Sequence, residues 1–284
     1  MLKRLLHLVR AFFLGEIGTA MRAVAIMERE RYVQSLLDHP RHADPRTLVR
    51  FGAKIYSQND EDGIIQEIFS RIGIDSKIFV EFGVENGLQN NTLKLLVEGW
   101  SGLWLEGSAK YVRAIEQTFG DVIAEKRLHV VEAFIDRDNI DAAIGKVYQG
   151  EIDLLSIDID GNDIYILEAL KVVRPRVIVI EYNGKFPPPM NLAQAYNPAH
   201  RWRGTDYGGA SLTAITAVAA RKGYTLVGCN ITGVNAFFVR NDLQIDRFCP
   251  PFTAERHYEP ARYFLTPTFQ AGHKADWGPY VSVR

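Results

Sequence analysis

Acidic residues recur through the middle of the sequence, and each group of them follows a run of apolar residues. The stretch "IFVEFGVENG" at residues 78–87 places Glu81 and Glu85 beside Gly83 and Gly87. Glycines in a turn after a strand allow a ligand to approach the backbone closely. The stretch "VEFGVENGLQNN" contains no Lys or Arg, so it would repel a diphosphate and attract a ligand with a positive centre.

Four further apolar runs end in the same way. The residues that follow them are Glu106; Glu132; Asp158, Asp160, Asn162 and Asp163; and Glu181, Tyr182 and Asn183. Any one of these residues alone is typical of a solvated loop or a helix cap. Because the carboxyl ends of parallel strands meet at one edge of a sheet, the five groups together predict one acidic site at that edge.

The elements that must position these residues alternate between two kinds. Strands are expected at 78–83, 101–107, 128–135, 153–160 and 176–183, with helices between them, and a final strand pair is expected at 224–230 and 235–240. Unbroken apolar strands separated by helices are typical of a parallel sheet covered on both faces. With right-handed crossovers, they predict a doubly wound α/β fold with a mostly parallel seven-stranded sheet.

The chain divides into three predicted regions. Residues 1–50 form an N-terminal helical extension, residues 51–248 form the α/β domain, and residues 249–284 form a C-terminal extension. An insert at about 184–209 follows the fifth strand, where the ligand edge is expected, and is rich in Pro and aromatic residues. A long insert at that edge indicates a substrate lid, and His200 lies within it.

Composition and charge exclude several classes of protein. The chain has 284 residues and a formal net charge of −1, so no overall field favours a nucleic acid partner. Two cysteines, Cys229 and Cys249, are too few for a disulfide framework and fit a cytoplasmic protein. No uncharged apolar stretch is long enough to predict a membrane-spanning helix.

The N-terminal region has an apolar face at helical spacing. The face consists of Leu2, Leu5, Leu6, Val9, Phe13, Ala20 and Val24. Most of the basic residues of this region lie off that face, including Arg4, Arg22 and Arg29. One interpretation is a helix docked on the domain or on a second subunit. The other is peripheral contact with a membrane surface, because basic residues flank an apolar face.

The nature of the cofactor follows from what the glycine turn lacks. There is no G-x-x-x-x-G-K-[ST] loop, and the G-x-x-x-G spacing of Gly83 and Gly87 differs from the dinucleotide G-x-G-x-x-G pattern. S-adenosylmethionine carries a sulfonium and an ammonium and no phosphate, so it suits this turn. Glu106 ends the next strand, where an acidic residue pairs with ribose hydroxyls in nucleotide-binding folds.

The stretch "FVEFGVENG" resembles the E/D-x-G-x-x-x-G motif of class I S-adenosylmethionine-dependent methyltransferases. The ordered set "SQNDEDGIIQEIF", "LLSIDIDGNDIYILEAL", "VIVIEYN" and "GCNITGVNAFFVR" resembles their FkbM-like branch, over about residues 55–240. We expect a cofactor-binding set of Glu81, Gly83, Gly87, Glu106, Glu132, Ala133 and Asp158. Within it, the resemblance implies that Glu81 and the two glycines shape the methionine pocket, and that residues 132–134 lie beside the adenine.

The stretch "DIDGND" departs from the "D-x-E-G-x-E" pattern of FkbM-type sequences, so a base role of their glutamates does not carry over. Asp160, Glu181 and Asn183 could instead bind Mg²⁺, which prefers oxygen ligands. Alternatively, Glu181 and Asn183 hydrogen-bond the acceptor directly and Asp160 takes its proton without a metal. Asp160 and His200 are the expected catalytic residues.

These observations predict an S-adenosylmethionine-dependent O-methyltransferase. By analogy with the family, the acceptor hydroxyl belongs to a glycan, a glycolipid or a secondary metabolite. Two alternatives remain open. One is a non-catalytic module that binds S-adenosylmethionine or a nucleoside as a scaffold, and the other is a NAD-dependent oxidoreductase.

Overall fold

The computed structural model describes residues 2–266 and 272–283, with side chains from residue 15 onward. The chain forms two compact units, Met1–Asp44 and Pro45–Arg284. The first unit contains the long helix α1 (Leu2–Leu37) and the short helix η1 (Pro40–His42). Within the described residues, no helix combines the length and the apolar character needed to cross a membrane.

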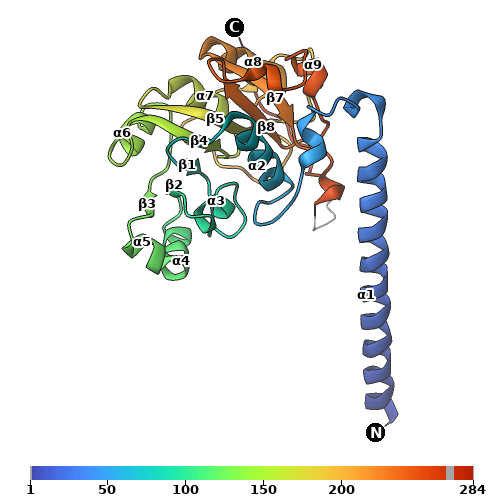
Figure 1. Cartoon of the computed structure of the whole chain (residues 1–284). Helices are drawn as coiled ribbons and strands as arrows, with labels where there is room; N and C mark the ends of the chain where they lie inside the picture. Colours follow the sequence, from blue (N-terminus) through green and yellow to red (C-terminus); the bar gives the residue numbers. More distant parts are fainter. Residues whose placement is uncertain (1, 267–271, 284) are drawn as a thin grey trace. The chain divides into compact units, whose positions relative to one another are not determined.

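The second unit is built on one seven-stranded sheet in the order β3-β2-β1-β4-β5-β8-β7 (Figure 1). Its strands are β1 (Ile78–Phe82), β2 (Ser101–Glu106), β3 (Leu128–Glu132), β4 (Gly150–Ile157), β5 (Val173–Glu181), β7 (Tyr224–Cys229) and β8 (Asn235–Arg240). The first five are parallel, and β8 is antiparallel to both β5 and β7. This confirms the predicted fold class. The strand order reverses between β1 and β4, where such sheets bind ligands.

Helices cover both faces of the sheet because its strands are apolar on both sides. They are α2 (Glu61–Ile72), α3 (Leu93–Val97), α4 (Ala109–Thr118), α5 (Gly120–Ala124), α6 (Ile140–Gly145), α7 (Asp163–Ala169) and α8 (Leu212–Arg221). Phe79 of β1 packs in one buried cluster with Ile68 of α2, whereas its neighbour Val80 packs in the other cluster with Ile166 of α7. Successive strand residues point to opposite faces, so β1 supplies both layers of the core.

The boundary between α7 and β5 differs from the prediction. Helix α7 ends at Ala169, and the fifth strand, expected at 176–183, already begins at Val173, so Pro175 lies inside a strand. Pro175 pairs with Ile152 of β4, whereas β8 pairs with β5 only from Val177 onward. Pro175 has no N–H to donate, and β8 does not pair with β5 at this position. Strand β5 therefore tolerates the proline.

A second, small sheet joins the insert to the C-terminal region. It pairs β6 (Leu192–Gln194) with β9 (Tyr280–Ser282) in antiparallel fashion. The remaining short helices are η2 (Leu48–Phe51), η3 (Ile245–Arg247), α9 (Ala254–His257) and η4 (Tyr263–Leu265). The C-terminal region is thus attached to the insert that follows β5.

Candidate functional site

The turn after β1 and the turn after β4 touch at the point where strand order reverses. Gly83 has φ +70°, and a Cβ atom on it would lie 1.7 Å from the carbonyl oxygen of Asp158. Any side chain at Gly83 would therefore push the two turns apart. The predicted glycine turn is present, and its first glycine is required for the contact between the two loops that form the site.

Glu81, which was predicted to shape the methionine pocket, also has a structural role. Its side chain is buried, and its carboxylate accepts hydrogen bonds from the backbone N–H groups of Asn91 and Thr92 at 2.9 and 3.1 Å. The hydroxyls of Thr92 and Ser156 donate to it at 2.5 and 3.0 Å. Burial raises the pKa of Glu81 to about 7, although these donors lower it. The carboxylate thus ties β1 to the start of α3 and to β4.

Glu106 holds the turn after β1 in place. Its two carboxylate oxygens accept hydrogen bonds from the backbone N–H groups of Glu85, at 2.9 Å, and Ser108, at 2.8 Å. Burial raises the pKa of Glu106, and the charge of Glu85 adds to the effect. Each oxygen keeps a further lone pair, so Glu106 can also accept from a ribose hydroxyl. At position 87, in contrast, core packing requires a glycine, because a Cβ atom there would lie 2.7 Å from the Trp104 ring.

The segment after β3 lies next to the turn after β2. Ala133 donates its backbone N–H to the carbonyl of Glu106 at 3.0 Å, and the side chain of Glu132 is exposed. A Cβ atom at Gly107 would lie 3.2 Å from the ring of Phe134. The residues that were predicted to lie beside the adenine are therefore adjacent to the residue that was predicted to hold the ribose.

Three carboxylates gather at the ends of β4 and β5. Oxygens of Asp158, Asp163 and Glu181 all lie within 4.8 Å of one another. Asp163 also accepts the backbone N–H groups of Ile159 and Gly161 at 2.8 and 2.7 Å. Burial, followed by repulsion between the carboxylates, raises the pKa of Asp158 and Glu181 well above the ordinary range, and burial raises that of Asp163 to about 6. The cluster is stabilised by a proton or by a cation.

The structure changes the membership of the predicted metal set. That set consisted of Asp160, Glu181 and Asn183. Asn183 instead donates its amide N–H groups to the carbonyls of Asp206 and Gly208 at 3.2 and 2.9 Å. Its oxygen accepts from the backbone N–H of Lys185 at 3.1 Å, so the side chain fixes the insert. Among the described residues, the group with metal-ligand spacing contains Asp163, which is not in the predicted set.

The two predicted catalytic residues are in contact: the side chain of His200 reaches the backbone of Asp160. The Nε2 atom of His200 lies 3.1 Å from the carbonyl oxygen of Asp160. A carbonyl can only accept, so Nε2 carries the hydrogen and Nδ1 is the acceptor of the neutral ring. A Cβ atom at Gly161 would lie 2.6 Å from the His200 ring, so this glycine allows the ring to cover the turn. The surrounding protein and the Glu85 carboxylate raise the pKa of Asp160, and His200 lowers it.

Gln194 and Tyr165, which the sequence interpretation did not identify, anchor the insert to the turn after β4 together with Asn162. The Gln194 amide donates to the side-chain oxygen of Asn162 at 3.3 Å, and the Tyr165 hydroxyl donates to the Gln194 carbonyl at 2.7 Å. Asn162 donates to the carbonyl of Asn197 at 2.8 Å. Asparagine and glutamine are common in loops, so no pattern in the sequence distinguished these.

Two cation–π pairs connect the insert to the segment after β3. The guanidinium of Arg201 lies 4.4 Å from the ring centroid of Phe134, and that of Arg137 lies 4.2 Å from the ring centroid of Tyr196. Each segment contributes one arginine and one aromatic ring. We call these two pairs the clasp. It joins the insert to the segment that was predicted to lie beside the adenine.

The first turn of α2 also has a structural role. Glu61 is fully buried and accepts hydrogen bonds from the side-chain amides of Asn230 and Asn235 at 2.8 and 2.9 Å. Asp62 accepts the backbone N–H groups of residues 55–57 at 2.6–2.8 Å. The acidic residues of "SQNDED" therefore bind the chain before α2 to the turn between β7 and β8.

No protein-family model matches the sequence, and a search of curated proteins finds no match. Among solved structures, the chain is similar to magnesium protoporphyrin IX methyltransferase from Synechocystis with bound S-adenosylmethionine. The two share 12% identity over 63% of this chain and 77% of that one, with a TM-score of 0.41. The N-terminal domain of EvdMO1 with bound S-adenosylhomocysteine shares 15% identity over 75% of this chain and 94% of that one, with a TM-score of 0.41.

The glycopeptide N-methyltransferase MtfA, also with S-adenosylhomocysteine, shares 13% identity over 68% of this chain and 95% of that one, with a TM-score of 0.40. These similarities are distant and say nothing about what this chain binds or does. We therefore base its function on its own residues.

Proposed function

We propose that the chain is an S-adenosylmethionine-dependent O-methyltransferase. The observation that carries the proposal is the chemistry of the loops at the strand-order reversal. The turn at 81–92 contains no Lys or Arg, and the turn opposite it leads into three carboxylates within 4.8 Å of one another. Such a surface disfavours phosphates and favours a nucleoside with a positive centre.

The residues around the reversal suit this cofactor. Glu106 has lone pairs left for ribose hydroxyls, and residues 132–134 flank the adenine position next to it. Glu85, in the turn after β1, offers a carboxylate to the methionine end. When bound, S-adenosylmethionine supplies an electrophilic methyl group on its sulfonium. The chain must then hold the acceptor in line and remove a hydroxyl proton.

His200 of the insert and Asp160 of the turn after β4 suit the removal of that proton. His200 has Nε2 fixed by the Asp160 carbonyl, which leaves Nδ1 to accept a proton. The Asp160 carboxylate is exposed next to it, and its raised pKa makes it a better base than an ordinary aspartate. Transfer to a hydroxyl needs one such base, so we assign the proton to this pair.

The donor set of Asp158, Asp163 and Glu181 fits Mg²⁺, a hard cation that prefers carboxylate oxygens. A metal at these residues would supply Lewis acidity to the acceptor hydroxyl and lower its pKa. We therefore include Mg²⁺ in the proposal, held by these three residues.

Aromatic residues of the insert and the C-terminal region support an acceptor with a ring, such as a glycan, a glycolipid or a secondary metabolite. Trp202 is 41% exposed and contacts His273, with ring centroids 5.0 Å apart. The rings of Tyr207 and Tyr280 pack 5.2 Å apart, beside His200. Such rings offer faces for sugar or aromatic groups.

Calorimetric titration of the whole chain tests the cofactor. We expect S-adenosylmethionine and S-adenosylhomocysteine to bind, and NADH and ADP not to bind. Preferential NADH binding would favour an oxidoreductase and reject the proposal.

Methyl transfer to a panel of glycan, glycolipid and phenolic acceptors tests the reaction. We expect transfer to one acceptor class, loss of transfer in EDTA with the cofactor still bound, and recovery with Mg²⁺. Binding without transfer to any acceptor would support the scaffold function instead. Full activity in EDTA would show that the reaction needs no metal, and His200 and Asp160 would then take the proton.

A further inference from the structure

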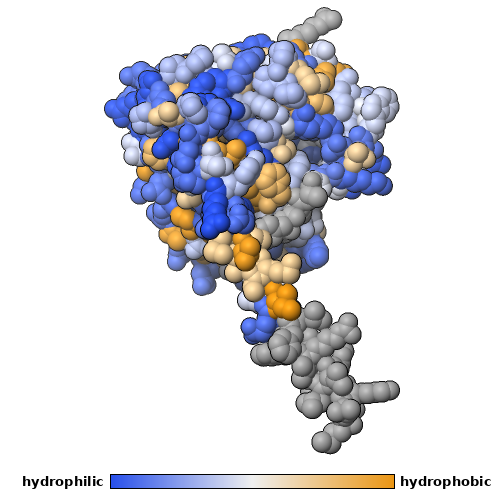
Figure 2. All heavy atoms as spheres, turned by 90° about the vertical axis from the view of Figure 1, so that its right-hand side faces the viewer, coloured by the Kyte–Doolittle hydropathy of each residue, from blue (hydrophilic) through white to orange (hydrophobic). Residues whose placement is uncertain are grey.

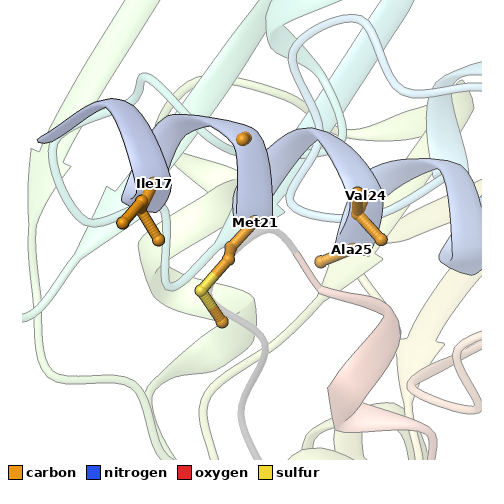
Figure 3. Close-up of a pocket in the computed structure, with 5 residues that line it drawn as sticks. Ile17, Met21, Val24 and Ala25 are labelled. Carbon is orange, nitrogen blue, oxygen red and sulfur yellow. The ribbon is translucent and has the colours of Figure 1, made fainter. Parts of the chain in front are cut away.

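Helix α1 carries an apolar stripe that is exposed to solvent. Ile17, Met21 and Val24 are 53%, 67% and 52% exposed. Together with Ala20 and Ala25 they line a shallow apolar hollow, and the labelled side chains point to the same side of the helix (Figure 3). Hydrophobic side chains are also visible on α1 in the space-filling view, where its described part begins (Figure 2). An apolar surface of this kind marks an interaction site.

The stripe has a defined extent along the helix. At helical spacing, Val9 and Phe13 continue it toward the N-terminus, where the backbone is helical from Leu2. The side chains before residue 15, which include most of the predicted apolar face, lie outside the described residues. Toward the C-terminus the stripe stops at Glu28, which pairs with Arg31 at 2.8 Å. The described part of the stripe, from Ile17 to Ala25, is about 12 Å long.

Charge indicates what covers the stripe. Residues 1–22 contain four cationic residues, Lys3, Arg4, Arg10 and Arg22, and a single acidic one, Glu16. We propose that α1 docks on an anionic membrane surface, with the stripe facing the acyl chains and the cationic residues facing lipid phosphates. A helix of this length with one apolar side and excess positive charge is typical of such docking. The proposal is independent of the catalytic function.

A second copy of the chain fits the stripe less well. The stripe ends at Glu28 and Arg31, so a paired helix seam would not continue into the last turns of α1. Two copies aligned along residues 1–22 would also bring two sets of four cations together, which costs free energy. An anionic surface removes this repulsion and covers the apolar side chains at the same time.

Co-sedimentation of the full-length chain with vesicles tests the proposal. We expect binding to vesicles that contain phosphatidylserine, little binding to pure phosphatidylcholine, and weaker binding as salt is raised. Val24→Glu should lower the bound fraction by about tenfold, because it places a carboxylate in the stripe. Ile26→Glu is the matched control: Ile26 is 40% exposed and lies two residues along, on nearly the opposite side of α1.

Three outcomes would overturn the proposal. The first is no binding to anionic vesicles by the wild-type chain. The second is an equal loss in Val24→Glu and Ile26→Glu, which would mean that the stripe is not the contact surface. The third is a wild-type dimer in sedimentation velocity that becomes a monomer in Val24→Glu, without vesicle binding, which would assign the stripe to a second copy. Circular dichroism melting of each variant confirms that it is folded.

Discussion

Glu106 has a structural role and, under the proposed function, a binding role, and substitutions at this position test the second. Glu106→Ala removes the acceptor for Glu85 and Ser108 and, under the proposed function, the partner of the ribose. We expect the affinity for S-adenosylmethionine to fall by about 1–3 kcal/mol, the cost of leaving buried polar partners unpaired. Isothermal titration calorimetry measures this. Glu116→Ala, on the exposed side of α4, is the control and should bind normally.

Glu106→Gln distinguishes charge from hydrogen bonding at the same position. It keeps one acceptor oxygen, so we expect a smaller loss of affinity than with Glu106→Ala. If both variants melt like the wild type and bind the cofactor with unchanged affinity, Glu106 is not part of the site.

His200 is expected to act on the acceptor and not on the cofactor. With Nε2 held by the Asp160 carbonyl, Nδ1 takes the hydroxyl proton. We expect His200→Ala to lower kcat by about 10²–10⁴-fold while the affinity for S-adenosylmethionine stays the same. His129→Gln, on β3, is the control histidine. A kcat within about threefold of the wild type would leave Asp160 as the base.

Residue types predicted the approach of some carboxylates better than they predicted the hydrogen-bond partners of each. Carboxylates after β4 and β5, two of the five predicted groups, lie together, with oxygens of Asp158, Asp163 and Glu181 within 4.8 Å of one another. Glu81 nevertheless serves the fold, because two backbone N–H groups and two hydroxyls converge on it from Asn91, Thr92 and Ser156. Those partners lie 10, 11 and 75 residues along the chain. Side-chain partnerships of this kind depend on packing, which no local pattern encodes.

At the scale of elements, we expect the clasp to slow release of the product under the proposed function. Arg201 of the insert packs on Phe134 at 4.4 Å, in the segment after β3. A cation–π pair contributes about 0.5–2 kcal/mol. Because the pair must open for exchange, we expect Arg201→Ala to raise the dissociation rate of S-adenosylhomocysteine by about 2- to 20-fold in stopped-flow measurements.

Arg203→Ala provides the matched control for the clasp. Arg203 lies two residues further along the same insert but pairs with Asp276 at 3.0 Å and has no contact with Phe134 among the described residues. It should release the product at the wild-type rate. Equal acceleration in both variants would show that any loosening of the insert speeds release, and the clasp would have no special role.

The elements themselves differ in how far the sequence predicts them. Strands β1, β2, β7 and β8 were expected close to their observed bounds, because apolar runs between glycines are strong local signals. The pairing of β6 with β9 was not expected. Both strands have three residues, and they are separated by more than 80 residues of chain. Short strands carry little periodicity, and a partner so distant leaves no local trace.

At the scale of the whole molecule, buried carboxylates set how stability depends on pH. Burial raises the pKa of Asp60 from 3.8 to about 7, with repulsion from Glu61 adding to the effect, and burial raises that of Glu81 from 4.5 to about 7. At pH values between the ordinary and the raised pKa of these two carboxylates, the folded chain holds more protons than the unfolded chain. The stabilising contribution is therefore complete below about pH 4 and is lost as pH rises through about 7.

We accordingly expect the free energy of unfolding to fall from pH 5 to pH 8 in urea titrations without ligand. The slope should approach about 1.4 kcal/mol per pH unit for each proton released. Asp60→Asn removes one titrating group and should flatten the pH profile of stability. The control Asp246→Asn, at an exposed position, should leave the shape of this profile unchanged. Asp60 lies against the backbone N–H of Ile231 at 3.4 Å, so Asn can keep this bond. Stability that rises across the same range would show that these carboxylates are ionised in the folded chain with ordinary or lowered pKa values, held by their hydrogen-bond donors.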